Sequence, residues 1–208
     1  MLASKRKTSI LHMVELAALT AIVVILQLTG VAIRIPILGT PVSLVLIPIT
    51  LGAMLLGPWA GAFLGFLFGL IVYITCGVMG MDPFTAFLFQ DHPIVTAGIC
   101  LVKSTLAGFL AGVVFRAVEK KNSLVATITA SAVTPVVNTG VFVLGCLVIM
   151  GTIEGYVGAV GLDVSGVYFI FVMCAGINFL FEFLVNMLFA SALHRVYKAI
   201  LAKLGASK

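Results

Sequence analysis

The stretch "GPWAGAFLGFLFG", residues 57–69, places glycine at every fourth position: Gly57, Gly61, Gly65 and Gly69. In a water-soluble helix, each interior glycine costs about 1 kcal/mol relative to alanine. In a bilayer the spacing becomes favourable, because lipid tails are as apolar as leucine and helices associate where small residues let their backbones approach. The stretch therefore predicts a membrane helix that packs tightly along its glycine face.

The composition agrees with a membrane setting. Of the 208 residues, 62% are hydrophobic and only 9% are charged. A soluble domain of this length has too little interior to bury so much apolar surface. The apolar runs show no strict alternation, which favours helices over a β-barrel. We therefore expect an all-α integral membrane protein.

Six stretches are apolar enough to cross a membrane, given that a spanning helix needs roughly 20 mostly apolar residues. They run over about 10–29, 40–56, 59–80, 94–116, 124–150 and 166–193. The second is short and meets the third at Gly57-Pro58. Because no linker separates them, we expect residues 1–208 to form a single membrane domain of six transmembrane helices.

The charged residues predict the orientation of these spans. With six spans, the basic residues that flank the first, fourth and sixth all fall on one side: Lys5, Arg6, Lys7, Arg116, Lys120, Lys121, Arg195, Lys198, Lys203 and Lys208. Loops on the cytoplasmic side of a membrane are enriched in Lys and Arg, so both termini are expected to be cytoplasmic. The net charge of +5 is thus a topology signal. Nucleic-acid binding is disfavoured, because the basic residues are split among separate segments.

Several classes of enzyme and metal site lack their motifs. The four cysteines are widely spaced in apolar context and form no CxxC pair, which favours buried hydrophobic roles. The three histidines lie near different membrane boundaries and form no HExxH motif. The segment before Lys103-Ser104 lacks the glycines of a phosphate-binding loop. We expect no catalytic residue, metal site, cofactor or intrinsic ATPase activity.

Two ionisable residues lie deep inside the predicted spans. Lys103 is about nine residues into the fourth span, and Glu182 is about sixteen residues into the sixth. Asn178 and Asn186 lie one turn on either side of Glu182, so the three share a helical face. Ionisable groups at membrane depth usually face the bundle interior or a cavity. We interpret the set as a polar cavity; the alternative is hydrogen bonding between helices, with Lys103 neutralising Glu182.

The fifth span adds polar groups to the same region. Thr134, Asn138 and Thr139 lie beside Pro135, which removes a backbone donor. This combination predicts a locally broken helix that lines a cavity.

Two outer segments carry apolar residues beside a few polar ones. They are residues 30–41, "GVAIRIPILGTP", which include Arg34, and residues 77–93, "GVMGMDPFTAFLFQDHP". Both are too apolar for free loops and too broken for a helix. We expect them to cover the cavity from the outer side, with interfacial loops that bind no ligand as the alternative.

Four stretches carry a resemblance to a known family. They are "ELAALTAIVVIL" in the first span, "PVSLVLIPITLGAMLLGPWAGAFLGFLFGLI" at residues 41–71, "PVVNTGVFVLG" around Asn138, and "NFLFEFLVN" in the sixth span. Together they make the chain resemble the substrate-binding S component of energy-coupling factor (ECF) vitamin transporters. The second stretch is the most specific of the four, and the pattern looks closest to the pantothenate and folate branch.

The resemblance implies a six-helix fold with a vitamin site near the outer face, in the plasma membrane of a prokaryote. It also implies a transmembrane coupling subunit and two cytoplasmic ATPase subunits as partners. Ala17 and Ala21, which match the small-residue motif of the first span, would dock on the coupling subunit. The expected substrate-binding residues are Arg34, Lys103, Asn138, Asn178 and Glu182. Pantothenate and folate both carry carboxylates, which suit the ammonium of Lys103.

A stand-alone secondary transporter or channel for a small organic solute is the main alternative. Inverted repeats with broken helices would favour it. No clear repeat relates residues 1–93 to residues 94–208. A membrane enzyme or a structural scaffold is a further alternative.

Overall fold

The computed structural model describes residues 2–32 and 44–203, and within those ranges every regular element is a helix. The long helices are α1 (Leu2–Ala32), α5 (Pro93–Val118), α6 (Ser123–Val148) and α9 (Ala175–Lys203). The shorter α-helices are α2 (Leu46–Leu56), α3 (Pro58–Val72), α4 (Pro83–Asp91), α7 (Met150–Ala159) and α8 (Gly166–Tyr168). Two π-helical segments, η1 (Tyr73–Val78) and η2 (Phe169–Cys174), continue α3 and lead into α9. The prediction of an all-α fold is confirmed.

Five helical stretches are long and apolar enough to cross a membrane: Ile10–Gly30, Pro58–Val78, Pro93–Val118, Ser123–Val148 and Gly166–Ile200. The predicted second span, 40–56, contains only the 11-residue helix α2 among its described residues. At 1.5 Å per residue, α2 is about 16 Å long, roughly half of a hydrocarbon core. Residues 40–43 lie outside the described residues, so the structure supports five spans of full length and one short apolar helix.

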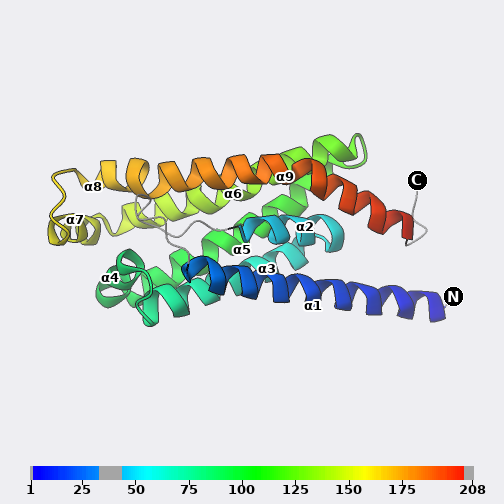
Figure 1. Ribbon diagram of the computed structural model, residues 1–208, viewed down its shortest axis with the longest axis horizontal. Coiled ribbons are helices and arrows are strands. Elements are labelled where there is room, and N and C mark those ends of the chain that lie inside the picture. The colour runs from blue at the N-terminus through cyan, green and yellow to red at the C-terminus, as the bar shows by residue number, and fades with distance from the viewer. Residues whose placement is uncertain (1, 33–43, 204–208) are drawn as a thin grey trace.

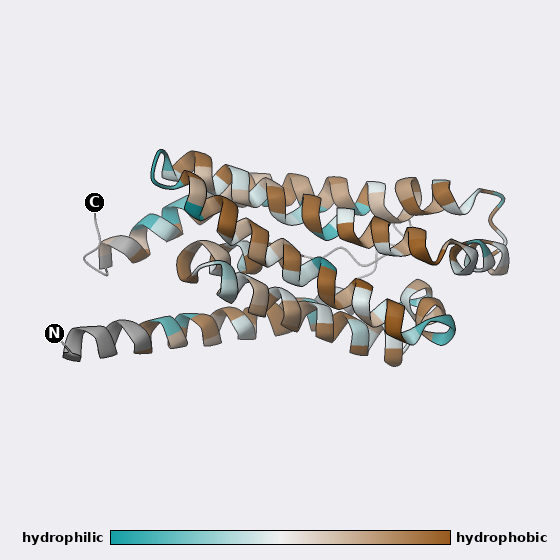
Figure 2. Ribbon diagram, turned by 180° about the vertical axis from the view of Figure 1, so that it is seen from behind, coloured by the Kyte–Doolittle hydropathy of each residue, from teal (hydrophilic) through white to brown (hydrophobic). Residues whose placement is uncertain are grey.

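The helices run back and forth along one axis (Figure 1). α6 and α9 pack together along one side, α1 and α3 along the other, and α5 packs against both α3 and α6. The start of α1, the turn between α5 and α6 and the end of α9 lie at one end, which we call the terminal end. α4 and α7 lie at the opposite end, which we call the distal end. Hydrophobic residues dominate the lengths of the long helices, and most hydrophilic residues lie near the two ends (Figure 2).

The glycine face of α3 packs against α5. A Cβ atom at Gly61 would lie 2.9 Å from the carbonyl carbon of Gly108, and one at Gly69 would lie 3.0 Å from that of Cys100. The α5 positions that face these glycines are themselves four residues apart: Cys100, Ser104 and Gly108. Any side chain on this face would push the two backbones apart. The predicted tight packing of the glycine face is confirmed, and its partner is α5.

The predicted break at Pro135 is wrong. α6 continues without interruption from Ser123 to Val148, with Pro135 buried inside it. The hydroxyls of Thr134 and Thr50 lie 2.8 Å apart, which ties α6 to α2 beside the proline. Neighbouring helices and Thr side chains commonly let a membrane helix tolerate proline.

The distal segment 77–93 also differs from the prediction that it is too broken for a helix. Its second half forms α4, because Asp82 caps the helix and Pro83 occupies its first turn. The Asp82 carboxylate accepts hydrogen bonds from the Thr85 backbone N–H at 2.8 Å and from the Thr85 hydroxyl at 2.6 Å. Asp as N-cap followed by Pro is a common start for a helix.

Candidate functional site

A cavity of about 80 Å³ lies among α1, α3, η1, α4, α5, α6 and α9. Its apolar wall includes Phe68, Phe84 and Phe142. Its polar lining consists of Gln27, Asp82, Thr85, Lys103, Asn138, Thr139, Asn178 and Glu182. The cavity therefore combines an apolar body with polar groups from several helices, as small-molecule sites usually do.

The structure brings four of the predicted site residues to this one cavity. They are Lys103 from α5, Asn138 from α6, and Asn178 and Glu182 from α9. The fifth, Arg34, lies outside the described residues. Two other predicted residues, Ala17 and Ala21, are exposed on α1 and do not line the cavity.

Glu182 is buried, with 2% of its surface exposed. The Asn178 side-chain amide donates to Glu182 Oε1 at 3.4 Å, whereas Oε2 has no hydrogen-bond partner among the described residues. The same holds for the side-chain oxygens of Asn138 and Asn178. An unpartnered buried acceptor costs about 1–3 kcal/mol. These three oxygens are therefore available to hydrogen-bond donors on a bound molecule.

Lys103 makes no ion pair with Glu182 in the described part of the chain, whose salt bridges join His92 to Asp91 and Arg116 to Glu119. The Lys103 ammonium instead lies 5.2 Å from the centroid of the Phe142 ring. A cation over an aromatic face gains roughly 0.5–2 kcal/mol, depending on its exposure to solvent. Among the described residues, Lys103 and Glu182 thus interact electrostatically across the cavity without forming an ion pair, and the ammonium is available to an anion.

An aromatic cluster surrounds the distal side of the cavity. Phe84, which is 2% exposed, packs edge-to-face on Tyr156 at 5.1 Å, on Phe169 at 5.5 Å and on Phe142 at 6.4 Å between ring centroids. Burial, with a smaller contribution from the nearby Asp82, raises the pKa of Tyr156. These contacts hold α4, α6, α7 and η2 together, so the cluster fixes the position of the cavity's distal wall.

Sequence reasoning missed several cavity residues. The sequence places Asp82 in an outer loop, but the residue is 3% exposed and lines the cavity beside Thr85. The Asp-Pro pair could have identified it as a helix cap. Gln27 of α1 is also buried, at 5% exposed, and lines the cavity. Because it is a polar residue within an apolar span, the sequence could have identified it as a site residue in the same way as Asn138.

Both π-helical segments border the cavity. Cys76 of η1 and Cys174 of η2 line it from two sides. π-Helical turns are rare and occur frequently at functional sites. Their position gives a second, backbone-level reason to regard this cavity as the functional site.

The family model for the ECF transporter, substrate-specific component, matches residues 11–196. The chain belongs to this family. No curated protein and no solved structure matches it. The prediction of an ECF S component is therefore confirmed, whereas its branch within the family stays a prediction.

Members of this family are transport subunits that bind a substrate, and they are not enzymes. Family membership also implies a small-molecule substrate and association with transmembrane and ATPase subunits. The S component described here is a multi-pass membrane protein, because its long apolar helices extend over most of the matched region.

Proposed function

We propose that this S component is the membrane-embedded, substrate-binding subunit of an ECF-type importer for a water-soluble vitamin or related micronutrient. Pantothenate is the favoured substrate and folate the next. The observation that carries the proposal is the convergence of Lys103, Asn138, Asn178 and Glu182 on one cavity, in a chain that belongs to the S-component family.

Each polar residue has a role in this proposal. The Lys103 ammonium binds a carboxylate of the substrate through a charge-assisted hydrogen bond. The amides of Asn138 and Asn178 bond to its amide or hydroxyl groups. Glu182 accepts a hydrogen bond from a substrate hydroxyl through Oε2, which has no partner among the residues that the structure describes.

The cavity must enlarge to hold a vitamin. Its volume of about 80 Å³ is below the roughly 300 Å³ at the lower end of ligand pockets. Pantothenate requires less enlargement than folate because it is the smaller molecule, which supports the order of preference.

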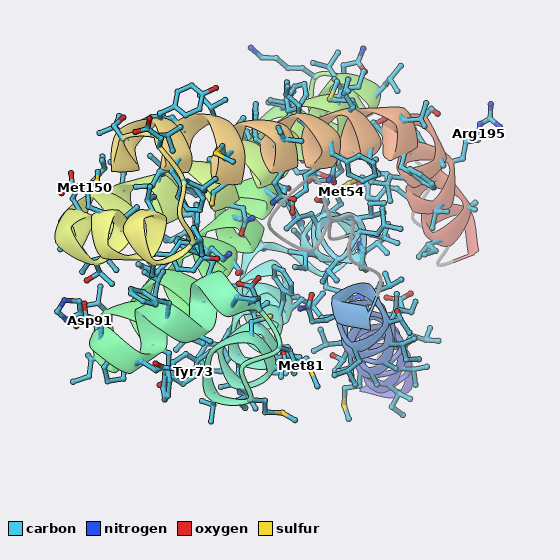
Figure 3. All side chains as sticks on the ribbon, turned by 60° about the vertical axis from the view of Figure 1, so that its left-hand side comes forward. Met54, Tyr73, Met81, Asp91, Met150 and Arg195 are labelled. Atoms are coloured by element: carbon cyan, nitrogen blue, oxygen red, sulfur yellow. The ribbon has the colours of Figure 1, made fainter. Side chains whose placement is uncertain are left out.

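We further propose that the chain crosses a prokaryotic plasma membrane six times, with both termini cytoplasmic. The distribution of charge supports this topology. Arg116, Lys120 and Arg195 lie towards the terminal end, whereas Asp91 lies at the distal end. In Figure 3, Arg195 projects from α9 far from Asp91 and Met150. Such asymmetry fits a cytoplasmic terminal end.

The partners in this proposal are a transmembrane coupling subunit and two cytoplasmic ATPase subunits. The exposed Ala17 and Ala21 on α1 form the docking surface for the coupling subunit. Small residues four apart permit the close backbone approach that such docking needs.

Affinity purification of the tagged chain from its native host, in mild detergent, tests the proposal. We expect ATPase subunits to co-purify, and we expect mass spectrometry of the extracted small molecules to detect a vitamin. Recovery of the chain alone, with transport that does not depend on ATP, would instead support the stand-alone transporter.

A further inference from the structure

Around the cavity, the described acidic side chains outnumber the described basic ones. Among the lining residues that the structure describes, one is cationic, Lys103, and two are carboxylates, Asp82 and Glu182. Both carboxylates are almost fully buried, at 3% and 2% exposed. When ionised, they are screened little by water, so their effect on a bound anion is stronger than that of surface charges.

The two carboxylates lie on different elements of the cavity wall. Asp82 caps α4 at the distal side, where Thr85 donates two hydrogen bonds to it. Glu182 lies on α9, with Oε2 lacking any partner within the described part of the chain. Over the same residues, neither carboxylate forms a salt bridge with Lys103. An anionic group can therefore bind at Lys103, but among the described residues a second anionic group elsewhere in the cavity meets carboxylates and no further cation.

The unpartnered polar atoms reinforce this asymmetry. Every fully buried cavity-lining side-chain atom that lacks a hydrogen-bond partner is an oxygen: Asn138 Oδ1, Asn178 Oδ1 and Glu182 Oε2, counted over the described residues. Glu182 accepts hydrogen bonds when ionised, as do the amide oxygens. The part of the ligand that faces α9 must therefore present donors, such as hydroxyl or N–H groups.

We infer that the cavity selects ligands with at most one anionic group, which binds at Lys103, and with hydrogen-bond donors on the part that faces Glu182. The inference rests on the proposed function and narrows its substrate class. It separates the two favoured vitamins: pantothenate has one carboxylate and two hydroxyls, whereas folate has two carboxylates. Phosphorylated vitamins that also carry a carboxylate are excluded for the same reason.

Binding of a charge-graded panel to the purified protein in nanodiscs tests the inference. The panel contains riboflavin and panthenol without an anionic group, pantothenate and biotin with one, and folate and 4′-phosphopantothenate with two. Titration calorimetry is run at one ionic strength for all six. We expect the tightest ligand to carry no more than one anionic group, and to bind at least about tenfold more tightly than either ligand with two, because like charges in a binding site discriminate strongly.

Removal of a carboxylate should relax the selection. Asp82→Asn keeps the helix cap, because Asn caps a helix as well as Asp does, and it removes only the charge. We expect it to raise the affinity for 4′-phosphopantothenate or folate on the order of tenfold relative to the ligand with one anionic group. Glu182→Gln provides a second variant that removes a charge from the opposite wall. Asp91→Asn is the matched control, since Asp91 lies at the same end as Asp82, is exposed and does not line the cavity.

The outcomes separate this inference from the proposed function. If the native protein binds a ligand with two anionic groups as tightly as any other, the charge selection is wrong and the vitamin-binding function stands. The charge selection is equally wrong if neither Asp82→Asn nor Glu182→Gln changes the relative affinities. If no member of the panel binds and no vitamin co-purifies, the proposed function falls and the inference falls with it.

Discussion

The backbone of α3 at Gly65 lies directly against the backbone of α5 at Ser104. A Cβ atom placed on Gly65 would be 2.6 Å from the carbonyl carbon of Ser104, closer than real Cβ contacts. Lys103 immediately precedes Ser104 in α5. This contact therefore also fixes the position of the Lys103 backbone relative to α3. The packing of α3 against α5 is thus part of the construction of the site.

Gly65→Ala should destabilise the protein. The added methyl group forces the two backbones apart, and overpacking of this kind typically costs about 1–3 kcal/mol. Thermal unfolding in detergent measures the change. Gly140→Ala is the control, because a Cβ placed at Gly140 meets no atom within 4 Å among the described residues, apart from its chain neighbours and the adjacent backbone of its own helix. Equal stability of both variants would show that the seam between α3 and α5 tolerates a side chain.

Lys103→Met should weaken pantothenate binding by about 2 kcal/mol or more, because the substrate carboxylate is left buried without its charged donor. Titration calorimetry with pantothenate and with folate measures the loss. An unchanged affinity would remove Lys103 from the site.

The double variant Lys103→Met/Glu182→Gln distinguishes two roles of the lysine. If Lys103 binds the substrate anion, the double variant should bind as weakly as Lys103→Met or more so. Near-normal binding by the double variant would show that Lys103 only balances the charge of Glu182. The structure favours the first result, since no salt bridge among the described residues joins Lys103 to Glu182.

Ala17→Trp/Ala21→Trp should abolish vitamin transport by the assembled complex while leaving binding to the isolated protein intact. Both alanines are exposed on α1 and do not line the cavity, so the bulky side chains obstruct only docking. Vesicle uptake and calorimetry provide the two measurements. Leu184→Trp, at a position 65% exposed on α9, controls for a tryptophan on another lateral face. Transport at the normal rate in the double variant would refute the docking assignment.

Thr134→Val should lower the free energy of unfolding by about 1 kcal/mol, the usual net contribution of a hydrogen bond. It removes the bond to Thr50 that ties α6 to α2. Thr129→Val is the matched control, because its hydroxyl donates to Val125 within the same helix. A loss of stability no larger than that of the control would show that the tie between α2 and α6 contributes nothing.

Local spacing predicted much of the fold. The four-residue period of Gly57–Gly69 indicated a tightly packed face, and Cys100, Ser104 and Gly108 repeat that period on α5. Periodicity within one helix does not identify the helix that packs against it, because the pairing of helices depends on the packing of the whole bundle. Hydropathy likewise located the apolar stretch 40–56 but could not show that only Leu46–Leu56 within it is helical among the described residues.

The residues of the candidate site could be predicted where a polar or charged residue interrupts an apolar span. Lys103, Asn138 and Glu182 are conspicuous in apolar spans, and the structure places them at one cavity. Asp82 was not conspicuous, because a carboxylate in an outer segment looks ordinary until the fold buries it. The π-helical segments η1 and η2 carry no residue pattern that distinguishes them from α-helix, since they arise from packing.

The seam between α3 and α5 has a mechanical consequence for ligand entry. Two backbones in direct contact, without side chains between them, cannot slide or separate by small rotamer changes. We therefore expect the wall that carries Lys103 to stay fixed while a ligand enters. Enlargement of the cavity is expected to come from another wall, such as the one where η2 leads into α9 and Cys174, Asn178 and Glu182 line the cavity. The occupied state is then expected to differ from the empty one in the position of α9, while α3 and α5 keep theirs.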